Sequence, residues 1–334
     1  MPAKLLYRQP IKSQDKRQLV AQKSTTRKVP AAYQQFLDRQ SVGYYVKRCS
    51  NLLSRRIGEI LQEHDLTSVH WVVLACLWRQ DGQPVTYLAK QLQQIGGTLT
   101  GVLDRMEKRK LVKRKRHPSD RRVYRVYLTA QGAALKDELP VLVQKMWTGI
   151  FKGIDPGDID NFSNLINHLL ANLSPEYTCA LPECDGSMPR KLSRILPPKS
   201  LGYRLKTTSM LLTRKFTDRI EPHNVTVTHW IVLCRLWQHD GVPVSEIGQY
   251  IEQVGGTLAG VLERMEERGL IYRKVDTSDR RRMLIYLTDE GERLFDVLPP
   301  IAVAVTSEML VGIKSKEQEF LKSFLCKMIE NLGG

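Results

Sequence analysis

The sequence predicts a mainly α-helical protein with small β-hairpins, organised as two tandem winged helix-turn-helix domains. Two observations lead to this prediction. The motif GGTLTGVLDRMEKR at residues 96–109 recurs as GGTLAGVLERMEER at residues 255–268. Around each copy, apolar residues at helical spacing give way to two short strands about a basic turn. The helices outside these units are expected to form a dimerisation region that joins the two domains as a pseudo-dimer.

One offset relates the two copies over most of the chain. Shifting the 334-residue sequence by 159 residues pairs Gly43 with Gly202 without any insertion. Between residues 95–126 and 254–285, 18 of 32 positions are identical, which chance does not produce. The duplication predicts a basic N-terminal arm over 1–40, a first winged helix domain over 41–173, a Pro-rich linker over 174–199 and a second winged helix domain over 200–334.

Each element of the first copy follows from a local signal. Apolar residues recur at helical spacing, a Thr or Ser precedes the second helix as a cap, and Pro84 stands in the expected first turn of the third. Pro118 marks the bend of the hairpin, and Pro140 is expected to kink or break its helix. The expected elements, in chain order, are helices over 41–64, 66–82, 84–94 and 98–110, two strands within 111–129, and helices over 129–151 and 155–173.

The helix over 98–110 has the position of a recognition helix, which enters the DNA major groove with its N-terminal residues. Gly96 and Gly97 precede it, and glycines there let the backbone approach a phosphate closely. The free N–H groups at the start of the helix also favour an anion. The same glycines are compatible with a simple tight turn, so both interpretations stand.

The charge of the chain favours a polyanionic partner. Lysine and arginine number 51 against 35 acidic residues, a formal net charge of +16 at pH 7, which suits nucleic acid or an anionic membrane surface. A merely basic soluble protein is the alternative. No apolar run is long enough to span a membrane, and the N-terminal segment lacks the apolar core of a signal peptide. We therefore expect a cytoplasmic, nucleoid-associated protein, whose arm over 1–40 either follows phosphates or is a solvated tail.

Neither a cofactor nor a catalytic centre is expected. The six cysteines are too few for a disulfide scaffold in a chain of this length, and Cys179 and Cys184 have no further ligands at zinc spacing. The sequence has no phosphate-binding loop ending in Lys-Ser or Lys-Thr, no HExxH motif and no GxSxG motif. These absences favour a binding protein over an enzyme.

The hairpins and the helices before them resemble the MarR family of bacterial transcription regulators. Members of that family carry Asp-x-Arg at the wing, followed by a strand and Leu-Thr-x-x-Gly. The corresponding residues here are Asp120, Arg122, Leu128, Thr129 and Gly132 in the first copy and Asp279, Arg281, Leu287, Thr288 and Gly291 in the second. The resemblance covers both copies, about four fifths of the chain.

The resemblance implies a dimeric repressor of transcription that binds double-stranded DNA and uses its first and last helices as the interface. It also implies that the wing arginine enters the minor groove and that the aspartate holds the basic residues of the wing in place. Many members bind a small, often phenolic effector near the junction of the dimerisation and DNA-binding lobes. Some carry a redox-sensing thiol on the first helix, where Cys49 stands here; an inert thiol is the alternative.

Two features depart from the family pattern. The chain holds two domains where the family usually has one. Gly101 and Gly260 stand where a bulky basic residue is often found in the recognition helix. Direct readout of bases would then fall to Thr98, Thr100 and Arg105, with the shape of the groove adding to specificity.

The residues predicted to contact DNA lie at the start and on the exposed face of the recognition helices and on the wings. In the first copy they are Gly97, Thr98, Thr100, Gly101, Arg105, Lys108, Arg114, Arg116, Asp120, Arg121 and Arg122. In the second copy they are Gly256, Thr257, Gly260, Arg264, Arg273, Asp279, Arg280 and Arg281. The repeated pairs His70-Trp71 and His229-Trp230 either border a pocket for a small aromatic effector or are core tryptophans beside a hydrogen-bonded histidine.

The duplication is compatible with two arrangements. In the first, the two copies pair within one chain, and their recognition helices lie about one DNA turn, ~34 Å, apart on an imperfect palindrome. The 26-residue linker is long enough for this pairing and raises the effective concentration of the second copy. In the second, two chains form a homodimer with four winged helices.

The two copies also differ in charge. Between residues 98 and 127 the first copy has eleven basic and three acidic residues, a net +8, whereas residues 257–286 have seven and five, a net +2. We therefore expect the first copy to supply most of the affinity for DNA. The rival function is a winged helix module that binds an acidic protein or RNA without operator specificity.

Overall fold

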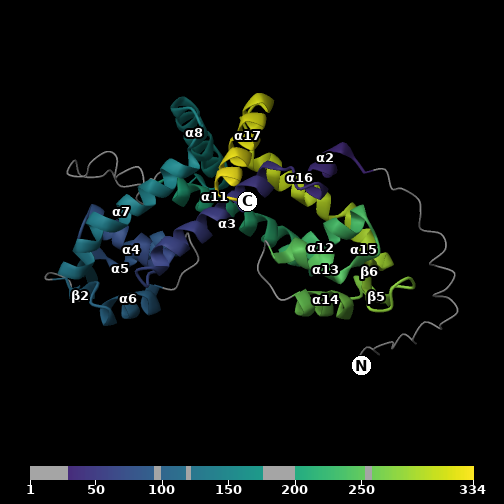
Figure 1. Ribbon diagram of the computed structural model, residues 1–334, viewed down its shortest axis with the longest axis horizontal. Helices are drawn as coiled ribbons and strands as arrows, with labels where there is room; N and C mark the ends of the chain where they lie inside the picture. Colours follow the sequence, from purple (N-terminus) through teal and green to yellow (C-terminus); the bar gives the residue numbers. More distant parts are fainter. Residues whose placement is uncertain (1–28, 94–98, 118–121, 176–199, 253–257) are drawn as a thin grey trace, which may run out of the picture.

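The structure, a computed structural model, describes residues 29–93, 99–117, 122–175, 200–252 and 258–334. It consists of two lobes joined by a central group of helices (Figure 1). The elements of the first half are α2 (Ala31–Leu37), α3 (Val42–Gln62), α4 (Ser68–Arg79), β1 (Gln83–Pro84), α5 (Val85–Gln93), α6 (Leu99–Lys108), β2 (Val112–Arg116), β3 (Tyr124–Leu128), α7 (Ala130–Ile150) and α8 (Pro156–Leu173). Those of the second half are α11 (Leu201–Ile220), η1 (Glu221–His223), α12 (Val227–Gln238), β4 (Val242–Pro243), α13 (Val244–Glu252), α14 (Leu258–Glu267), β5 (Ile271–Val275), β6 (Met283–Leu287), α15 (Asp289–Arg293), η2 (Leu294–Asp296), α16 (Leu298–Met309) and α17 (Ser315–Asn331).

The expected helices of the first half are all present, with ends close to the predicted ones. The predicted cap of the second helix is confirmed: Thr67 accepts the N–H of His70 at the start of α4. Pro84 lies just before α5, in a short strand that the sequence pattern does not single out. Each lobe therefore contains a three-stranded antiparallel sheet, in the order β1-β3-β2 or β4-β6-β5, rather than a two-stranded hairpin.

The sheet is attached to the helix-turn-helix unit by a side chain at the end of α4. Within the hairpin, Val112 lies opposite Leu128, and Arg116 lies opposite Tyr124. Asp81 accepts the N–H of Leu128 at 2.8 Å. The equivalent aspartate in the second half accepts the N–H of Leu287 at 2.9 Å. Both hairpins are thus held against their helices by the same contact.

The Leu-Thr-x-x-Gly motif joins the hairpin to the next helix, and its glycine is required for a steric reason. Thr129 Oγ1 accepts the N–H of Gly132 at 3.1 Å and so caps α7. A Cβ on Gly132 would lie 2.0 Å from the carbonyl oxygen of Leu111. The carbonyl of Gly132 accepts a hydrogen bond from Trp78 Nε1 at 3.0 Å. The second copy repeats the arrangement, since a Cβ on Gly291 would lie 2.2 Å from a backbone oxygen.

Proline affects equivalent helices differently in the two halves. Helix α7 continues through Pro140 as one helix, so of the kink or break expected there, the break is wrong for the first half. The equivalent stretch of the second half is divided into α15, η2 and α16, with Pro299 and Pro300 in the first turn of α16. Two consecutive prolines remove two N–H donors and crowd the preceding turn, whereas one proline can be accommodated with a local adjustment.

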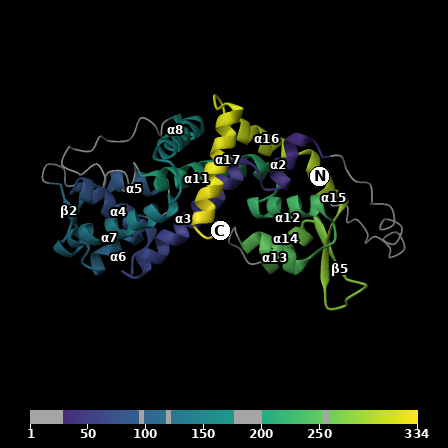
Figure 2. The same cartoon turned by 45° about the horizontal axis from the view of Figure 1, so that its top comes forward.

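The two halves contribute to a common hydrophobic core, and the second lobe has a further core of its own. Helix α3 of the first half packs along α11 of the second, α17 packs on α3, and α8 packs on α11 and α16 (Figures 1 and 2). Buried residues from both halves belong to the same cluster. Within it, the rings of Phe162 in α8 and Phe324 in α17 stack 4.1 Å apart. None of the described helices is long and apolar enough to cross a membrane.

Helix α2 packs on the lobe of the other half. Leu37 is buried in the core of the second lobe, and the ring of Tyr33 meets that of Phe295 edge-on at 5.9 Å. Gln238 Nε2 donates a hydrogen bond to Asp38 at 2.9 Å. The sequence pattern places these residues in the basic arm, because a seven-residue helix is too short to show a clear apolar period.

Two asparagines at equivalent positions hold the halves together by the same contacts. Asn172 in α8 donates to two carbonyl oxygens at the end of α16, at 2.9 and 2.8 Å. Asn331 in α17 donates to two carbonyl oxygens at the end of α7, at 2.7 and 3.0 Å. The last carbonyls of a helix have no partner within it, so these amides supply the missing donors.

We expect Asn172→Ala and Asn331→Ala each to lower the free energy of unfolding by about 1–2 kcal/mol, because each removes two hydrogen bonds between the halves. Urea denaturation measures the change. Asn164→Ala, at an exposed position of α8, is the matched control and should be neutral or slightly stabilising, because alanine favours a helix. The same loss in all three variants would mean that the amide contacts contribute nothing.

Candidate nucleic-acid interface

The two predicted recognition helices lie on one side of the molecule. In Figure 1, α6 and α14 both lie along the lower edge, while α8 and α17 project from the upper edge. The hairpins β2–β3 and β5–β6 lie on the outer flanks of α6 and α14. Both helix-and-hairpin units are therefore accessible from the same direction.

Helix α6 is held in place by one face and exposes the other. Three residues at helical spacing are buried in the lobe, namely Val102, Leu103 and Met106. Thr100, Arg105 and Lys108 are exposed. In α14 the same spacing buries the equivalent apolar residues and leaves Arg264 exposed. The helices thus present an arginine at the same position in both halves.

Gly101, in the first turns of α6, has no internal reason to be glycine. A Cβ at this position would meet nothing within 4 Å, and a glycine inside a helix costs about 1 kcal/mol relative to alanine. Glycine is used where another backbone must approach closely. An external partner lying against the start of α6 would account for it, and Gly260 stands at the equivalent position of α14.

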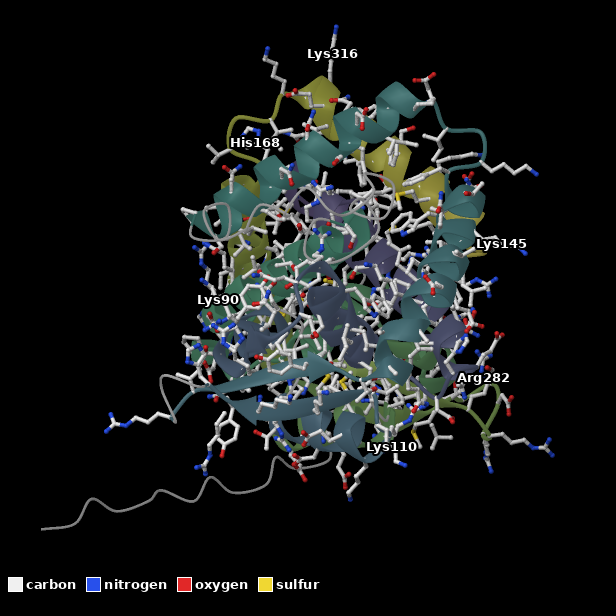
Figure 3. All side chains as sticks on the ribbon, turned by 90° about the vertical axis from the view of Figure 1, so that its left-hand side faces the viewer. Lys90, Lys110, Lys145, His168, Arg282 and Lys316 are labelled. Carbon is white, nitrogen blue, oxygen red and sulfur yellow. The ribbon has the colours of Figure 1, made fainter. Side chains whose placement is uncertain are left out.

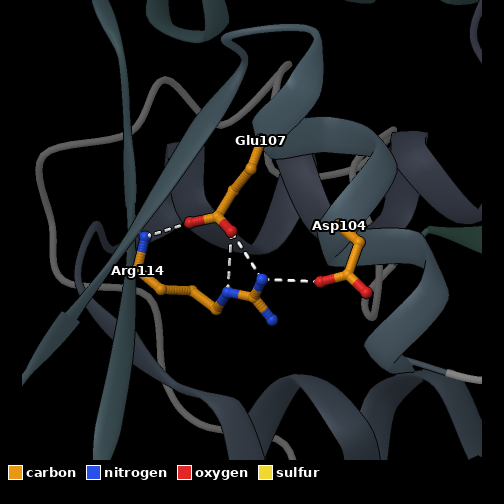
Figure 4. Close-up of polar contacts among 3 residues, drawn as sticks. All are labelled: Asp104, Glu107 and Arg114. Atoms are coloured by element: carbon orange, nitrogen blue, oxygen red, sulfur yellow. Dashed lines mark hydrogen bonds and ion pairs between the residues drawn. The ribbon is translucent and has the colours of Figure 1, made fainter.

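Arg114 is turned towards the recognition helix. Its guanidinium donates to Glu107 Oε2 at 2.8 Å and to Asp104 Oδ1 at 2.6 Å, and its backbone N–H donates to Glu107 Oε1 at 2.7 Å (Figure 4). The hydrogen bonds to Glu107, and then to Asp104, raise the pKa of Arg114. In the second half Arg273 lies 3.1 Å from Glu266. These arginines hold the hairpin against the helix, and a contact from them to DNA stays a prediction.

The tips of the hairpins carry the other predicted arginines. In the second half Asp279 accepts the N–H of Arg281 at 3.0 Å, which shapes the turn, and Arg280 and Arg281 are exposed. In the first half Arg122 is exposed. Arg116 Nε donates to a tyrosine hydroxyl of β3 at 3.0 Å. Six predicted contact residues lie outside the described residues: Gly97, Thr98, Asp120, Arg121, Gly256 and Thr257.

Further basic residues lie on the same side without having been predicted as contacts. Figure 3 shows Lys110 and Arg282, one from each half, towards the end of the molecule where the hairpins lie, with Lys316 at the opposite end. Lys110 has a φ of 55°, in the left-handed region, where the second copy has Gly269 at 64°. A lysine in this conformation carries a steric cost of roughly 1 kcal/mol, which favours a role for its charge.

The repeated histidines complete helix caps. His70 Nδ1 accepts the N–H of Thr67 at 3.2 Å, and His229 Nδ1 accepts the N–H of Thr226 at 3.4 Å. In return each threonine hydroxyl accepts the N–H of its histidine. This reciprocal arrangement is a capping box. For His70 and His229 the local geometry thus agrees with the reading as hydrogen-bonded core residues.

We expect His229 to make the fold sensitive to acid. Burial, with smaller contributions from Arg268 and Arg264, lowers the pKa of His229 to about 4, whereas an unfolded histidine titrates near 6.5. Between these values only the unfolded chain is protonated, so the stability present above pH 6.5 is lost as the pH falls towards 4, by up to about 3 kcal/mol. Urea denaturation at several pH values should show a flatter dependence for His229→Gln. His168→Gln, at an exposed site, should keep the wild-type dependence; equal flattening in both would assign the effect elsewhere.

The two tryptophans beside these histidines differ in environment. Both are buried in the core of their lobe, but Trp230 also lines a cavity of about 510 Å³ between the halves. Phe216 of α11 also lines the cavity, and Lys47 and Arg48 of α3 contribute cations. The sequence singles out Trp230 by its repetition. It gives no signal for the cations, because they come from the other half of the chain.

Cys49 is inert in this fold. It is completely buried in α3, and burial raises the pKa of its thiol to about 12. A redox-sensing cysteine reacts as the thiolate, so of the two alternatives for Cys49 the structure favours the unreactive thiol. Within the described ranges, no group of His, Cys, Asp or Glu side chains could hold a metal ion.

Comparison with known proteins gives one family for both halves. The MarR family matches residues 66–124 and 225–283. The organic hydroperoxide resistance transcriptional regulator of Bacillus subtilis (strain 168) is 30% identical over 147 residues, covering 43% of this chain and 97% of that protein. The transcriptional regulator HosA of Escherichia coli O157:H7 is 41% identical over 106 residues, covering 32% of this chain and 78% of HosA. A crystal structure of the S. aureus MepR–DNA complex matches at 27% identity with a TM-score of 0.37, covering 40% of this chain and 96% of that chain. The chain therefore belongs to the MarR family of transcription regulators, with one match to that family in each half.

Proposed function

We propose that the protein is a sequence-specific, double-stranded DNA-binding repressor of transcription in which the two halves of one chain form the DNA-binding pair. The observation that carries this proposal is the position of α6 and α14 on one side of the molecule, each with an exposed arginine. A duplex lying along that side would meet both helices and both hairpins.

The shared core supports pairing within one chain over a homodimer of chains. Helices α3 and α11 occupy each other's apolar faces, and α8 and α17 complete the same core. A second chain would have to displace these contacts to form the same interface. One chain should therefore occupy one operator, an imperfect palindrome whose half-sites are about one turn apart.

Base readout in this proposal falls to exposed residues of the recognition helices. Arg105 and Arg264 are of the type that binds guanine with two hydrogen bonds. The absence of a side chain at Gly101 lets the start of α6 lie close to the duplex. The hairpin arginines, Arg122 and Arg281, are assigned to the minor groove beside each half-site.

A small aromatic effector releases this protein from its operator. The cavity between the halves is the assigned site, because it borders Trp230 of the second lobe and α3 of the central region. A molecule there would contact the central helices α3 and α11, which set the spacing of the two lobes, and it would also contact the second lobe through Trp230. Binding that favours a different spacing would weaken the fit to two successive turns of DNA.

The test is selection of genomic fragments by the full chain in moderate salt with competitor DNA, followed by sequencing. A few enriched fragments with an imperfect palindrome are expected. The double variant Arg105→Glu/Arg264→Glu, with exposed substitutions that spare the core, should lose the enrichment. No selected fragment, or only salt-sensitive binding of all fragments, would instead support the module for an acidic protein or RNA. Sedimentation of the complex should give one chain per operator, and two chains would overturn the internal pair.

A further inference from the structure

The cavity between the halves has an equivalent position that is filled by side chains. The 159-residue offset relates Thr306, which lines the cavity, to Trp147. Trp147 is only 7% exposed, and its ring stacks on that of Phe151 with centroids 5.1 Å apart. It lies so close to α11 that a Cβ on Gly202 would be 3.0 Å from the ring. A large aromatic side chain thus occupies, in the first half, the place that a small hydroxyl side chain leaves open in the second.

Two equivalent tyrosines differ in the same way. Tyr203 is 5% exposed, and its hydroxyl donates to the carbonyl oxygen of Gln91 in α5 at 3.0 Å. Tyr44 instead lines the cavity, and its hydroxyl accepts a hydrogen bond from Arg48 Nη1 at 3.4 Å within α3. Tyr203 therefore ties the central helix α11 to the first DNA-binding lobe, whereas Tyr44 forms part of an open wall.

The lining of the cavity indicates the chemistry of its occupant. Its charged residues are all basic, namely Arg39, Lys47, Arg48 and Arg55. Arg55 also pairs with Glu59 at 3.4 Å. Burial, and then the charge of Lys206, lower the pKa of Lys47. A bound anion would offset the repulsion between these two lysines and would itself be stabilised by their charges. The aromatic rings of Phe216 and Trp230 supply the apolar wall. A flat apolar body with one negative charge fits both features.

We propose that the chain has a single effector site instead of the two that a symmetric pair would have. One amphipathic aromatic anion binds between α3, α11 and α12, and the equivalent position is permanently occupied by the chain's own Trp147 and Tyr203. The first lobe is fixed to the central helices, and the ligand acts on the second lobe alone. The last statement rests on the proposed function, whereas the number and the charge of the ligand do not.

Isothermal titration of the full chain with naphthalene-2-carboxylate tests the site without DNA. The expected result is one molecule per chain and at least tenfold weaker binding of the uncharged naphthalene-2-carboxamide. Thr306→Trp copies the filled half and should abolish binding, with circular dichroism to verify the fold. Arg48→Gln, which leaves the cavity open, should weaken the carboxylate about tenfold and leave the amide unchanged.

Contrary results would count against the number of ligands, their chemistry or the place where they bind. Two molecules per chain would mean that the first half is also open. Equal affinity for the acid and the amide, or no binding at millimolar carboxylate, would rule out an aromatic anion as the ligand. Unchanged binding in a folded Thr306→Trp variant would rule out this cavity as the binding site. If one molecule binds as expected and the operator complex is unaffected, the site stands and its regulatory role falls. If the ligand-free protein does not bind operator DNA at all, the proposed function falls, but the ligand site does not.

Discussion

Gly132→Ala is expected to lower the free energy of unfolding by about 3 kcal/mol or more, because the new Cβ would lie 2.0 Å from the carbonyl oxygen of Leu111. That oxygen belongs to the backbone at the start of the hairpin, so no flexible side chain can move aside. Relief of the contact would also disturb the cap from Thr129 and the hydrogen bond from Trp78. Chemical denaturation measures the loss, and Gly291→Ala should behave in the same way in the second half.

Gly149→Ala is the matched control for this prediction. It lies in the same helix, α7, and a Cβ there would meet nothing within 4 Å. Alanine should therefore stabilise the protein by about 0.5–1 kcal/mol, since it restricts the unfolded chain without a steric cost. If Gly132→Ala were as mild as Gly149→Ala, the glycine of the family motif would not be explained by the approach of Leu111.

Arg122→Ala is expected to weaken operator binding by about 1–3 kcal/mol, a loss of roughly fivefold to 150-fold, and Arg281→Ala by less. The reason is the difference in charge between the two copies, net +8 against net +2 over equivalent residues. The first copy makes more phosphate contacts in this proposal, so its hairpin is held more firmly in the groove. Fluorescence anisotropy on operator DNA at several salt concentrations measures both the affinity and its salt dependence, which falls by about one unit for each lost phosphate contact.

The control for this comparison is Lys316→Ala, which removes a cation from the end of the molecule opposite the hairpins (Figure 3). It should leave the affinity and the salt dependence unchanged. An equal effect of Arg122→Ala and Arg281→Ala would show that the charge difference does not decide the affinity. An effect of Lys316→Ala as large as either would place the DNA on another surface.

The parts of the fold that follow from local signals could be predicted from the sequence. Apolar periodicity, the cap at Thr67 and the duplicated hairpin motif are set by neighbouring residues, and the repetition at one offset shows each signal twice. The family follows from the same motifs. The internal repeat also directs attention to His229 and Trp230, although it cannot distinguish a cap from a ligand contact.

Features that depend on distant partners could not be predicted. Leu37 of α2 is buried in the second lobe, about two hundred positions away along the chain. The hydrogen bonds from the Arg114 side chain to Glu107 and Asp104 depend on the angle at which the hairpin packs on α6, which the sequence does not show. The cavity combines Arg48 with rings from the other half. A charge count records such residues without showing where they converge.

The exchange of Thr306 for Trp147 at equivalent places shows what duplication within one chain allows. When a dimer is built from two identical polypeptides, any substitution appears twice, so a residue that closes one pocket closes both. Here each copy can change on its own, because the two equivalent positions are separate residues of one chain. A single substitution can therefore fill the position at Trp147 while the equivalent position at Thr306 stays open.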